Sequence, residues 1–447
     1  MTKTDSLSTT METVLAKAKH HGAEAADVIV VKDVSLVVGH RLGKVERIER
    51  SEGQDLGLRV LIGKRQAIVS GTDFSAKALD ELALRAVAMA KTVPEDPYCG
   101  LALPEQLARD IPDLDGLDPV EPSVEDLTER VAAIEDAALS IKGVTNSDGA
   151  EAGWSRGEVA ILASNGFHGH YIGSGHSVSV AVIAGTDDGM ETGYDWTAAT
   201  HGGDLRDLQE IGHNAGARAV ARLGAQKSKT FKGPVVFENR IASTLVGHLA
   251  GAINGAAIAR GTSFLKDHLG DQILAKGVSV IDDPHRRRGL RSKPFDAEGL
   301  PNRRRALIED GILKTWVLDL RNARQLGLSS TGHASRGTSG PPSPSTTNLW
   351  IEAGTVTVDE LIADIDEGLF VTSLFGQGVN LITGDYSRGA SGFRIVKGKL
   401  AEPVKEATVA GNLKDMYLTL RPAKDLEWRS GSDAPTVRID GMTVAGQ

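Results

Sequence analysis

The chain has 447 residues, of which 40% are hydrophobic and 24% charged, and its formal net charge is −9. This composition is that of an ordinary globular protein with room for two or three domains, and the acidic balance argues against a general binder of nucleic acid or of anionic membranes. One Cys excludes a disulfide framework, the N-terminal segment lacks a signal-peptide core, and no apolar run approaches the roughly 18 residues that span a bilayer, so we expect a cytoplasmic protein.

Residues 1–95 are expected to form an N-terminal α+β module. An amphipathic pattern predicts a helix over 6–21, and a strong apolar stripe predicts a second helix from Ser75 to Thr92. Between them the hydrophobic period is two, which indicates an antiparallel meander with short turns that contain Gly. The strands of this meander are expected at 28–31, 35–38, 56–62 and 66–69.

A Pro-rich stretch, 96–122, is expected to be a linker. It holds Cys99, the one Cys of the chain, and no His stands beside it. We interpret Cys99 as an inert or incidentally exposed side chain rather than a nucleophile, because a reactive thiol needs neighbours that favour the thiolate.

A second α+β module is expected over 123–225. Its strands carry His168, His170 and His176, and a His-x-His pattern on one strand places two imidazoles on the same face. A metal site would need a third ligand, and no carboxylate stands at a useful sequence spacing, so the alternative is a polar strand face. Helices are expected to flank these strands at 124–141 and 205–223.

The C-terminal part, 231–447, is expected to be a β-rich domain around a buried helix at about 239–259. The segment from Ile241 to Leu265 is apolar, rich in Ala and Gly, and has helical spacing. His248 lies in its middle. A His in such a place is either a hydrogen-bonded core residue or part of a site.

This helix lacks the usual signature of a zinc peptidase. Such a helix normally carries two His on one face and a Glu beside the first His. Here Ser243 and Thr244 precede His248. Neither hydroxyl replaces an imidazole as a zinc ligand, and Thr244 cannot act as a carboxylate base on metal-bound water. The helix therefore does not build a zinc site by itself.

This domain has three further features: two short basic runs, a predicted hairpin turn and a loop that is open to two interpretations. The basic runs 285–288 and 303–305 are short, so solvated loops or contacts with an acidic partner surface are favoured over nucleic acid. Asp310-Gly311 predicts a hairpin turn. The loop 335–346, rich in Gly, Ser and Pro, is either a mobile lid or a long surface connection.

The last third of the chain carries one more candidate cluster. Residues 347–375 predict a strand, a short helix and a strand. After them, the Gly-flanked segment 384–393 holds four polar residues that either orient a peptide or a partner's metal site, or form a turn held by an Arg–Asp pair. These residues are Asp385, Tyr386, Ser387 and Arg388.

The segment around His248 resembles the central helix of the TldD/PmbA (TldE) family of two-subunit metallopeptidases. In TldD-type subunits this helix reads HExxxH, with His at the place of Ser243, Glu at Thr244 and the second His at His248. This chain keeps only the last residue, as the PmbA/TldE-type subunit does. The family spacing puts the two His about 140° apart on an ideal helix, so we expect a local unwinding, which Gly247 permits.

The resemblance extends to 295–304, 330–334 and 384–393. At the last of these the TldD-type subunit supplies a Cys ligand, and residues 231–447 contain no Cys. The resemblance implies that the chain is a PmbA/TldE-like subunit of a cytoplasmic heteromeric zinc metallopeptidase, with no metal or catalytic residue of its own. A TldD-like partner would supply the zinc, and the substrates would be small or unfolded polypeptides such as peptide-antibiotic precursors and antitoxins. The alternatives are an independent hydrolase and a non-enzymatic scaffold or binding protein.

Overall fold

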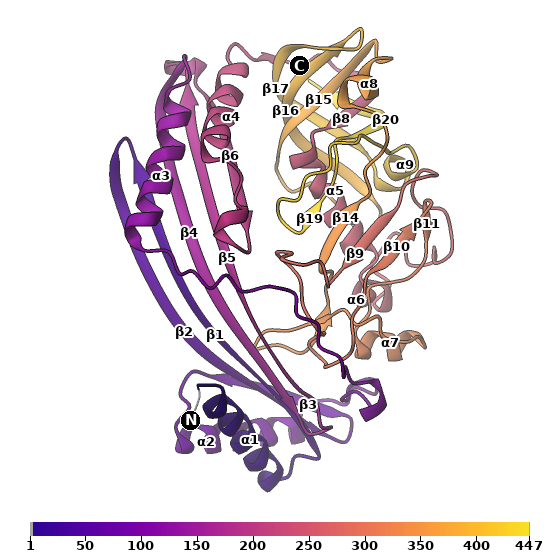
Figure 1. Ribbon diagram of the computed structural model, residues 1–447. Helices are drawn as coiled ribbons and strands as arrows, with labels where there is room; N and C mark the ends of the chain where they lie inside the picture. Colours follow the sequence, from indigo (N-terminus) through magenta and orange to yellow (C-terminus); the bar gives the residue numbers. More distant parts are fainter. Residues whose placement is uncertain (1–2, 447) are drawn as a thin grey trace.

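The computed structural model describes residues 3–446, apart from the side chains of residues 3–6 and 188; residues 1–2 and 447, which the expected domains include, lie outside it. An N-terminal half built on one long sheet stands beside a strand-rich C-terminal domain (Figure 1). The expected α+β fold class is confirmed. Among the described helices, none is both long and apolar enough to cross a membrane.

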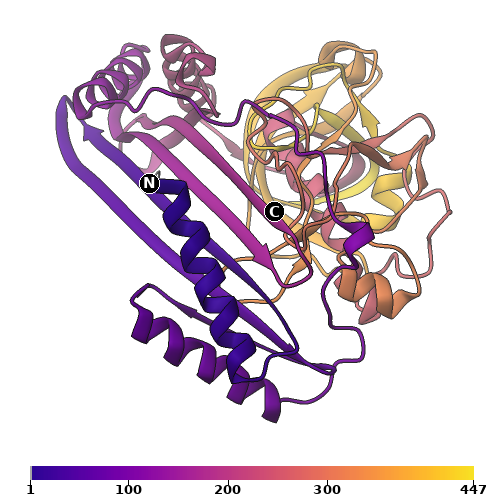
Figure 2. The same cartoon turned by 60° about the horizontal axis from the view of Figure 1, so that its bottom comes forward.

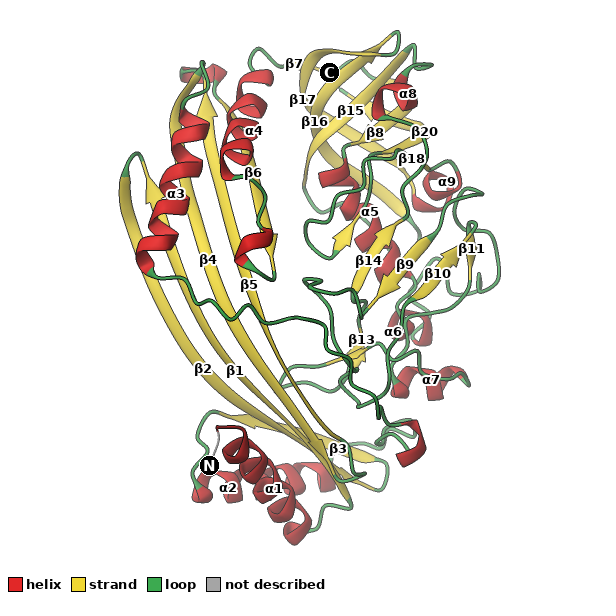
Figure 3. Cartoon of the chain, in the orientation of Figure 1, coloured by secondary structure: helices red, strands yellow, loops and turns green. Residues whose placement is uncertain are grey.

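One six-stranded antiparallel sheet, in the order β3–β2–β1–β4–β5–β6, runs through the N-terminal half (Figure 3). Because β1 pairs with β4 as well as with β2, the strands on both sides of the Pro-rich stretch belong to one sheet. The strands are β1 (Ala25–Arg41), β2 (Lys44–Ile62), β3 (Arg65–Gly71), β4 (Val144–Ala163), β5 (His168–Ala184) and β6 (Glu191–Ala199).

The strand lengths expected in the meander were wrong. Separate strands at 28–31 and 35–38 are one continuous β1, and β2 begins at Lys44, well before the expected start at 56. Residues 44–54 of β2 are exposed on both faces and mostly polar, so they show no apolar alternation. They form a strand because their backbone pairs with β1, and such pairing produces no hydrophobic pattern by which the sequence could indicate it.

Four helices cover one face of this sheet. The even-numbered residues of β1 pack beneath them: Val28 and Val30 beneath α1 and α2, and Leu36 and Val38 beneath α3 and α4. Figure 2 shows the ribbons of α1 and α2 lying against the sheet. Since side chains alternate across a strand, both helix pairs lie on the same face, and Ile29 points the other way, toward Phe295 of the C-terminal domain. The helices are α1 (Lys3–His21), α2 (Ala76–Thr92), α3 (Val124–Leu139) and α4 (Leu208–Ala221).

The Pro-rich stretch is held between the two halves of the molecule. The Arg324 guanidinium donates hydrogen bonds to the carbonyls of Tyr98, Gly100 and Leu101 within it. Cys99 is 3% exposed, and burial raises the pKa of its thiol. The expectation that Cys99 is exposed was therefore wrong, and its burial agrees with the alternative, an inert thiol.

The C-terminal domain is built on a seven-stranded sheet in the order β18–β20–β8–β15–β16–β17–β7, and a further β20–β17 pairing closes its middle strands into a barrel-like arrangement. These strands are β7 (Gln226–Lys227), β8 (Phe231–Phe237), β15 (Glu367–Phe375), β16 (Asp385–Val396), β17 (Lys399–Asn412), β18 (Arg421–Pro422) and β20 (Val437–Ala445).

Two smaller sheets complete the domain, in the orders β11–β10–β9–β14–β19 and β12–β13. The hairpin turn expected at Asp310-Gly311 is confirmed, with φ of 49° and 80° between β10 and β11. The strands are β9 (Val280–Asp283), β10 (Arg305–Glu309), β11 (Ile312–Leu313), β12 (Ala334–Ser335), β13 (Ser343–Pro344), β14 (Asn348–Ile351) and β19 (Ser432–Asp433).

The buried helix expected at 239–259 is two helices, α5 (Asn239–Ala252) and α6 (Gly255–Ala259). The break falls at Asn254, whose side chain accepts a hydrogen bond from the Ala256 amide and so starts α6. The remaining short helices are α7 (Leu320–Leu326), α8 (Val358–Ile362) and α9 (Leu413–Leu418).

The loop 335–346 is neither a mobile lid nor a simple surface connection. It reaches the N-terminal sheet, where the Arg336 side chain is fully buried and pairs with Asp27 of β1. The Thr338 hydroxyl hydrogen-bonds the carboxylate of Asp55 on β2. The loop is therefore a docked arm between the two halves.

The basic run 285–288 lies in a loop with Arg287 and Arg288 exposed, as expected of a solvated loop, and it is also paired within the chain. Arg287 and Arg288 lie 3.0 Å and 2.6 Å from the Asp115 carboxylate. Arg286 stacks on the Trp428 ring, 3.8 Å from its centroid. These contacts join the C-terminal domain to the Pro-rich stretch and neutralise part of the run's charge.

Candidate functional site

Helix α5 is continuous, including at Gly247. The expected local unwinding was therefore wrong. On a regular helix Ser243 and His248, five residues apart, lie about 140° apart around the axis. The apolar side of the helix is buried in the core of the domain. Its buried residues are Ile241, Ala242, Leu245, Val246, Leu249 and Ala252.

Ser243 and Thr244 use their hydroxyls within the helix. Ser243 donates to the Arg240 carbonyl at 3.0 Å, and Thr244 donates to the Ile241 carbonyl at 2.7 Å. Such back-bonds to the preceding turn are common for Ser and Thr in helices. Both side chains are half-buried and present no ionisable group at this point of the helix.

His248 faces Tyr386 of β16, with ring centroids 6.0 Å apart at 74°. Its buried Nε2 atom has no hydrogen-bond partner among the described residues. Burial, and then the positive charge of Arg388, lower the pKa of His248. The imidazole is thus held in its neutral form, the form that accepts a proton or binds a metal.

The four polar residues of 384–393 start strand β16, so the prediction of a turn held by Arg388 and Asp385 was wrong. Alternation of the strand divides them between two faces. Tyr386 and Arg388 lie on the face toward His248, while Asp385 and Ser387 are exposed on the other. Burial raises the pKa of Tyr386, whose hydroxyl has no hydrogen-bond partner in the described structure.

The arrangement does not fit a catalytic zinc ion. Three protein ligands hold such an ion in most enzymes. Around α5 the donor set consists of His248 alone, beside two hydroxyls that point into their own helix. In the part of the chain that the structure describes, no group of three or more His, Cys, Asp or Glu side chains comes together with metal-binding geometry.

Two of the three His residues of β5 do have carboxylate neighbours, contrary to expectation. Glu158 on the paired strand β4 lies 2.8 Å from His170, and Asp118 of the Pro-rich stretch lies 3.1 Å from His176. His168 is exposed at the start of the strand. His170 and His176 thus have one acidic partner each. Strand pairing supplies that of His170 and the Pro-rich stretch supplies that of His176, and the sequence spacing indicates neither.

A buried acidic pair in the 295–304 segment was not expected. Asp296 accepts hydrogen bonds from three backbone amides, and Glu298 accepts one from the Leu320 amide. Burial raises the pKa of Asp296 to about 6 and that of Glu298 to about 8, where the charge of Asp296 adds to the effect. Two acidic residues between Pro294 and Gly299 are the pattern of an exposed turn, so the sequence does not indicate that their carboxyls are buried.

Three models of one protein family match the chain in succession. They are described as PmbA/TldA metallopeptidase domain 1, over residues 26–90, the central domain, over 117–223, and the C-terminal domain, over 230–446. The chain is also 39% identical over 446 residues to Metalloprotease PmbA of Escherichia coli O157:H7, covering 99% of this chain and 96% of that relative.

Solved structures share the whole fold. A protein of Bacteroides thetaiotaomicron, described as a candidate modulator of DNA gyrase, superposes with a TM-score of 0.91 at 25% identity and covers 99% of both chains. TldE from Thermococcus kodakarensis superposes with a TM-score of 0.86 at 22% identity, covering 98% of this chain and 100% of that one. The latter likeness shows the fold alone.

Proposed function

The chain belongs to the PmbA/TldD metallopeptidase family, and from this premise we propose that it is the PmbA/TldE-type subunit of a cytoplasmic heteromeric zinc peptidase. A TldD-like partner chain supplies the zinc ion, its ligands and the Glu base. This chain shapes the chamber in which small or unfolded polypeptides are cleaved.

The observation that carries the proposal is the chemistry of α5. The two positions that would hold a ligand and a base carry Ser243 and Thr244, whose hydroxyls are bonded to their own helix. His248 keeps a neutral imidazole on another side of that helix. A chain that retains the fold but not the donor set is suited to complete a site made by another chain.

The face around His248 and Arg388 is the part of this chain that we propose to contact a substrate peptide or the partner. Arg388 is half-buried and makes one long hydrogen bond, 3.5 Å, to the Phe375 carbonyl, so its guanidinium is available to a polar ligand. His248 Nε2 lacks a partner among the described residues but is buried, so a ligand would reach it only after a side-chain movement. Asp385 and Ser387, exposed on the other face of β16, offer further polar contacts.

An exposed strand edge supports loose sequence specificity. Residues 44–55 of β2 pair with β1 on one side, while β3 pairs only with 56–62. The outer backbone groups of 44–55 therefore have no partner strand within the described chain. An extended peptide could add to such an edge through main-chain hydrogen bonds, which read no side chain.

The deciding experiment measures zinc content and peptidase activity of this chain alone, of the TldD-like subunit alone, and of the mixture. We expect the chain to be inactive and to hold less than stoichiometric zinc, and the mixture to be active. His248→Ala and Arg388→Ala should each lower activity of the mixture, whereas Arg304→Ala, at an exposed site outside α5 and β16, should not.

Two outcomes favour the alternatives. Activity of the chain alone that His248→Ala abolishes would identify an independent hydrolase. Failure to bind or activate a TldD-like chain, together with no activity of its own, would favour a scaffold or binding protein.

A further inference from the structure

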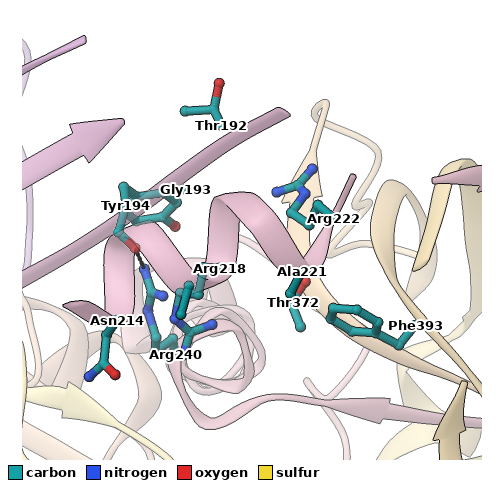
Figure 4. A pocket seen from close by; sticks show the side chains of 11 residues that line it. Thr192, Gly193, Tyr194, Asn214, Arg218, Ala221, Arg222, Arg240, Thr372 and Phe393 are labelled. Atoms are coloured by element: carbon teal, nitrogen blue, oxygen red, sulfur yellow. Dashed lines mark hydrogen bonds between the residues drawn. The ribbon is translucent and has the colours of Figure 1, made fainter. Parts of the chain in front are cut away.

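A cavity of about 290 Å³ lies in the seam between the two halves of the molecule, away from His248. We refer to it as the seam pocket. One wall comes from β6 and α4 of the N-terminal half, and the other from α5, β15 and β16 (Figure 4). Its lining residues are Thr192, Gly193, Tyr194, Asn214, Ala217, Arg218, Ala221, Arg222, Arg240, Thr372 and Phe393.

Every charged group that lines the seam pocket is a guanidinium. Arg218, Arg222 and Arg240 contribute to its wall, and none of the described lining residues is acidic. Two of the three have carboxylate partners at the edge: Arg218 donates two hydrogen bonds to Glu238, at 2.6 Å and 3.0 Å, and Arg222 lies 3.3 Å from Glu191. The third guanidinium is in a different position.

Arg240 is buried without a full set of partners. Its side chain is 5% exposed, and its Nε–H has no hydrogen-bond acceptor in the described part of the chain. The nearest carboxylate oxygen, on Asp195, is 3.9 Å away and already accepts from Arg429 and from the Trp196 amide. One Arg240 nitrogen donates to the Tyr194 carbonyl at 3.0 Å, as Figure 4 shows, and its guanidinium lies over the Tyr194 ring.

The electrostatic setting of Arg240 calls for an anion. Burial lowers its pKa, and the positive charge of Arg218 lowers it further. A buried donor without an acceptor costs free energy, and a buried charge costs more. An oxyanion beside Arg218 and Arg240 would offset the charge of the two guanidiniums and relieve the repulsion between them, and guanidiniums suit carboxylate and phosphate groups in shape.

We propose that the seam pocket binds a small oxyanion, a carboxylate or phosphate group, through Arg240 and Arg218. Phe393, Ala217 and Ala221 form an apolar wall beside these cations, so the ligand has room for a short apolar part. The volume admits a small molecule and not a folded chain. The proposal does not depend on the peptidase role, because it rests on the pocket alone.

The test is calorimetric titration of the full-length chain in a buffer without competing oxyanions. Inorganic phosphate forms one arm, an acetylated dipeptide with a free C-terminal carboxylate forms the second, and the same dipeptide as its amide forms the third. We expect the phosphate or the carboxylate to bind, whichever is the natural chemistry, and the amide not to bind. Binding should weaken as salt is added, because screening reduces the attraction.

Two variants locate the site. Arg240→Gln should weaken binding about tenfold or more, since a charge-assisted hydrogen bond is lost. Ala217→Glu places a carboxylate at an exposed position of the wall and should abolish binding without removing a buried contact. Arg85→Gln, on the exposed side of α2, changes the net charge as much and should have no effect.

The outcomes separate cleanly. Absence of binding by both phosphate and the carboxylate would overturn the proposal, as would binding that survives both Arg240→Gln and Ala217→Glu. If Arg240→Gln does not fold, Ala217→Glu decides the question, because it replaces an exposed side chain.

Discussion

The guanidinium of Arg336, in the loop after β12, hydrogen-bonds the carboxylate of Asp27 on β1, and both side chains are buried. Asp27 also accepts from Arg59 of β2, so one carboxylate joins two guanidiniums. Burial acts to raise the pKa of Asp27, but the Arg336 and Arg59 charges outweigh it and hold the pKa below its usual value. The cluster fastens the C-terminal domain to the long sheet.

We expect Arg336→Gln to destabilise the chain by about 3 kcal/mol, because removing one member of a buried ionic cluster leaves the others undercompensated. Urea unfolding gives the free energy. Arg304→Gln is the matched control: its guanidinium is largely exposed and 3.8 Å from Glu352, so the change should stay within about 0.5 kcal/mol. Equal effects of the two substitutions would show that the buried cluster does not hold the halves together.

Gly57 of β2 tests the docked arm without touching a charge. A Cβ atom there would lie 2.1 Å from the Thr338 carbonyl oxygen, so Gly57→Ala must displace the arm. Such overpacking typically costs about 1–3 kcal/mol. We expect trypsin to cleave after Arg336 at least about fivefold faster in this variant, since Arg336 leaves its buried position.

Gly157, on β4 of the same sheet, is the control for Gly57. A Cβ atom added there meets nothing within 4 Å. Gly157→Ala should therefore leave the rate of cleavage after Arg336 unchanged. Slow cleavage in both variants would mean that the arm is not packed against Gly57 in solution.

The sequence predicts what local chemistry determines. Ser75 and Ser123 start α2 and α3 by accepting hydrogen bonds from amides three residues later, and such caps are visible in the sequence. The resemblance around His248 likewise located α5. Arg336, a partner of Asp27, lies in a distant loop, and Asp118, the partner of His176, lies in the Pro-rich stretch, so neither periodicity nor spacing indicates them.

Glu298 should make stability depend on pH. Its pKa is raised to about 8 in the folded chain, so the folded state holds a proton that the unfolded chain, near the ordinary value of 4.5, releases. The resulting stabilisation is complete below about pH 4.5 and is lost as the pH rises through 8. Asp296 has a pKa of about 6, so its contribution to stability is lost at a lower pH than that of Glu298.

The substitution Glu298→Gln removes this titration and keeps an oxygen to accept from the Leu320 amide. At pH 9 we expect the variant to be more stable than the wild type by at least about 1 kcal/mol, since one unit of pKa is worth about 1.4 kcal/mol. Near pH 5 the two should differ little. Urea unfolding at both values measures this, and Glu105→Gln, exposed on the Pro-rich stretch, should change neither. A wild type that loses no more stability than Glu298→Gln would contradict the buried, protonated state.

The last prediction concerns the missing zinc ligands. Ser243→His with Thr244→Glu restores the residues of the TldD-type helix around His248. Because α5 is continuous and residues 231–447 contain no Cys, the restored His and His248 still lack a third ligand beside them. We therefore expect less than stoichiometric zinc in the double variant alone, measured by elemental analysis after dialysis. The same variant with His248→Ala sets the background of nonspecific zinc. Stoichiometric zinc that depends on His248 would show that this chain can complete a metal site without a partner, and would remove the main support for a subunit whose chemistry is supplied by another chain.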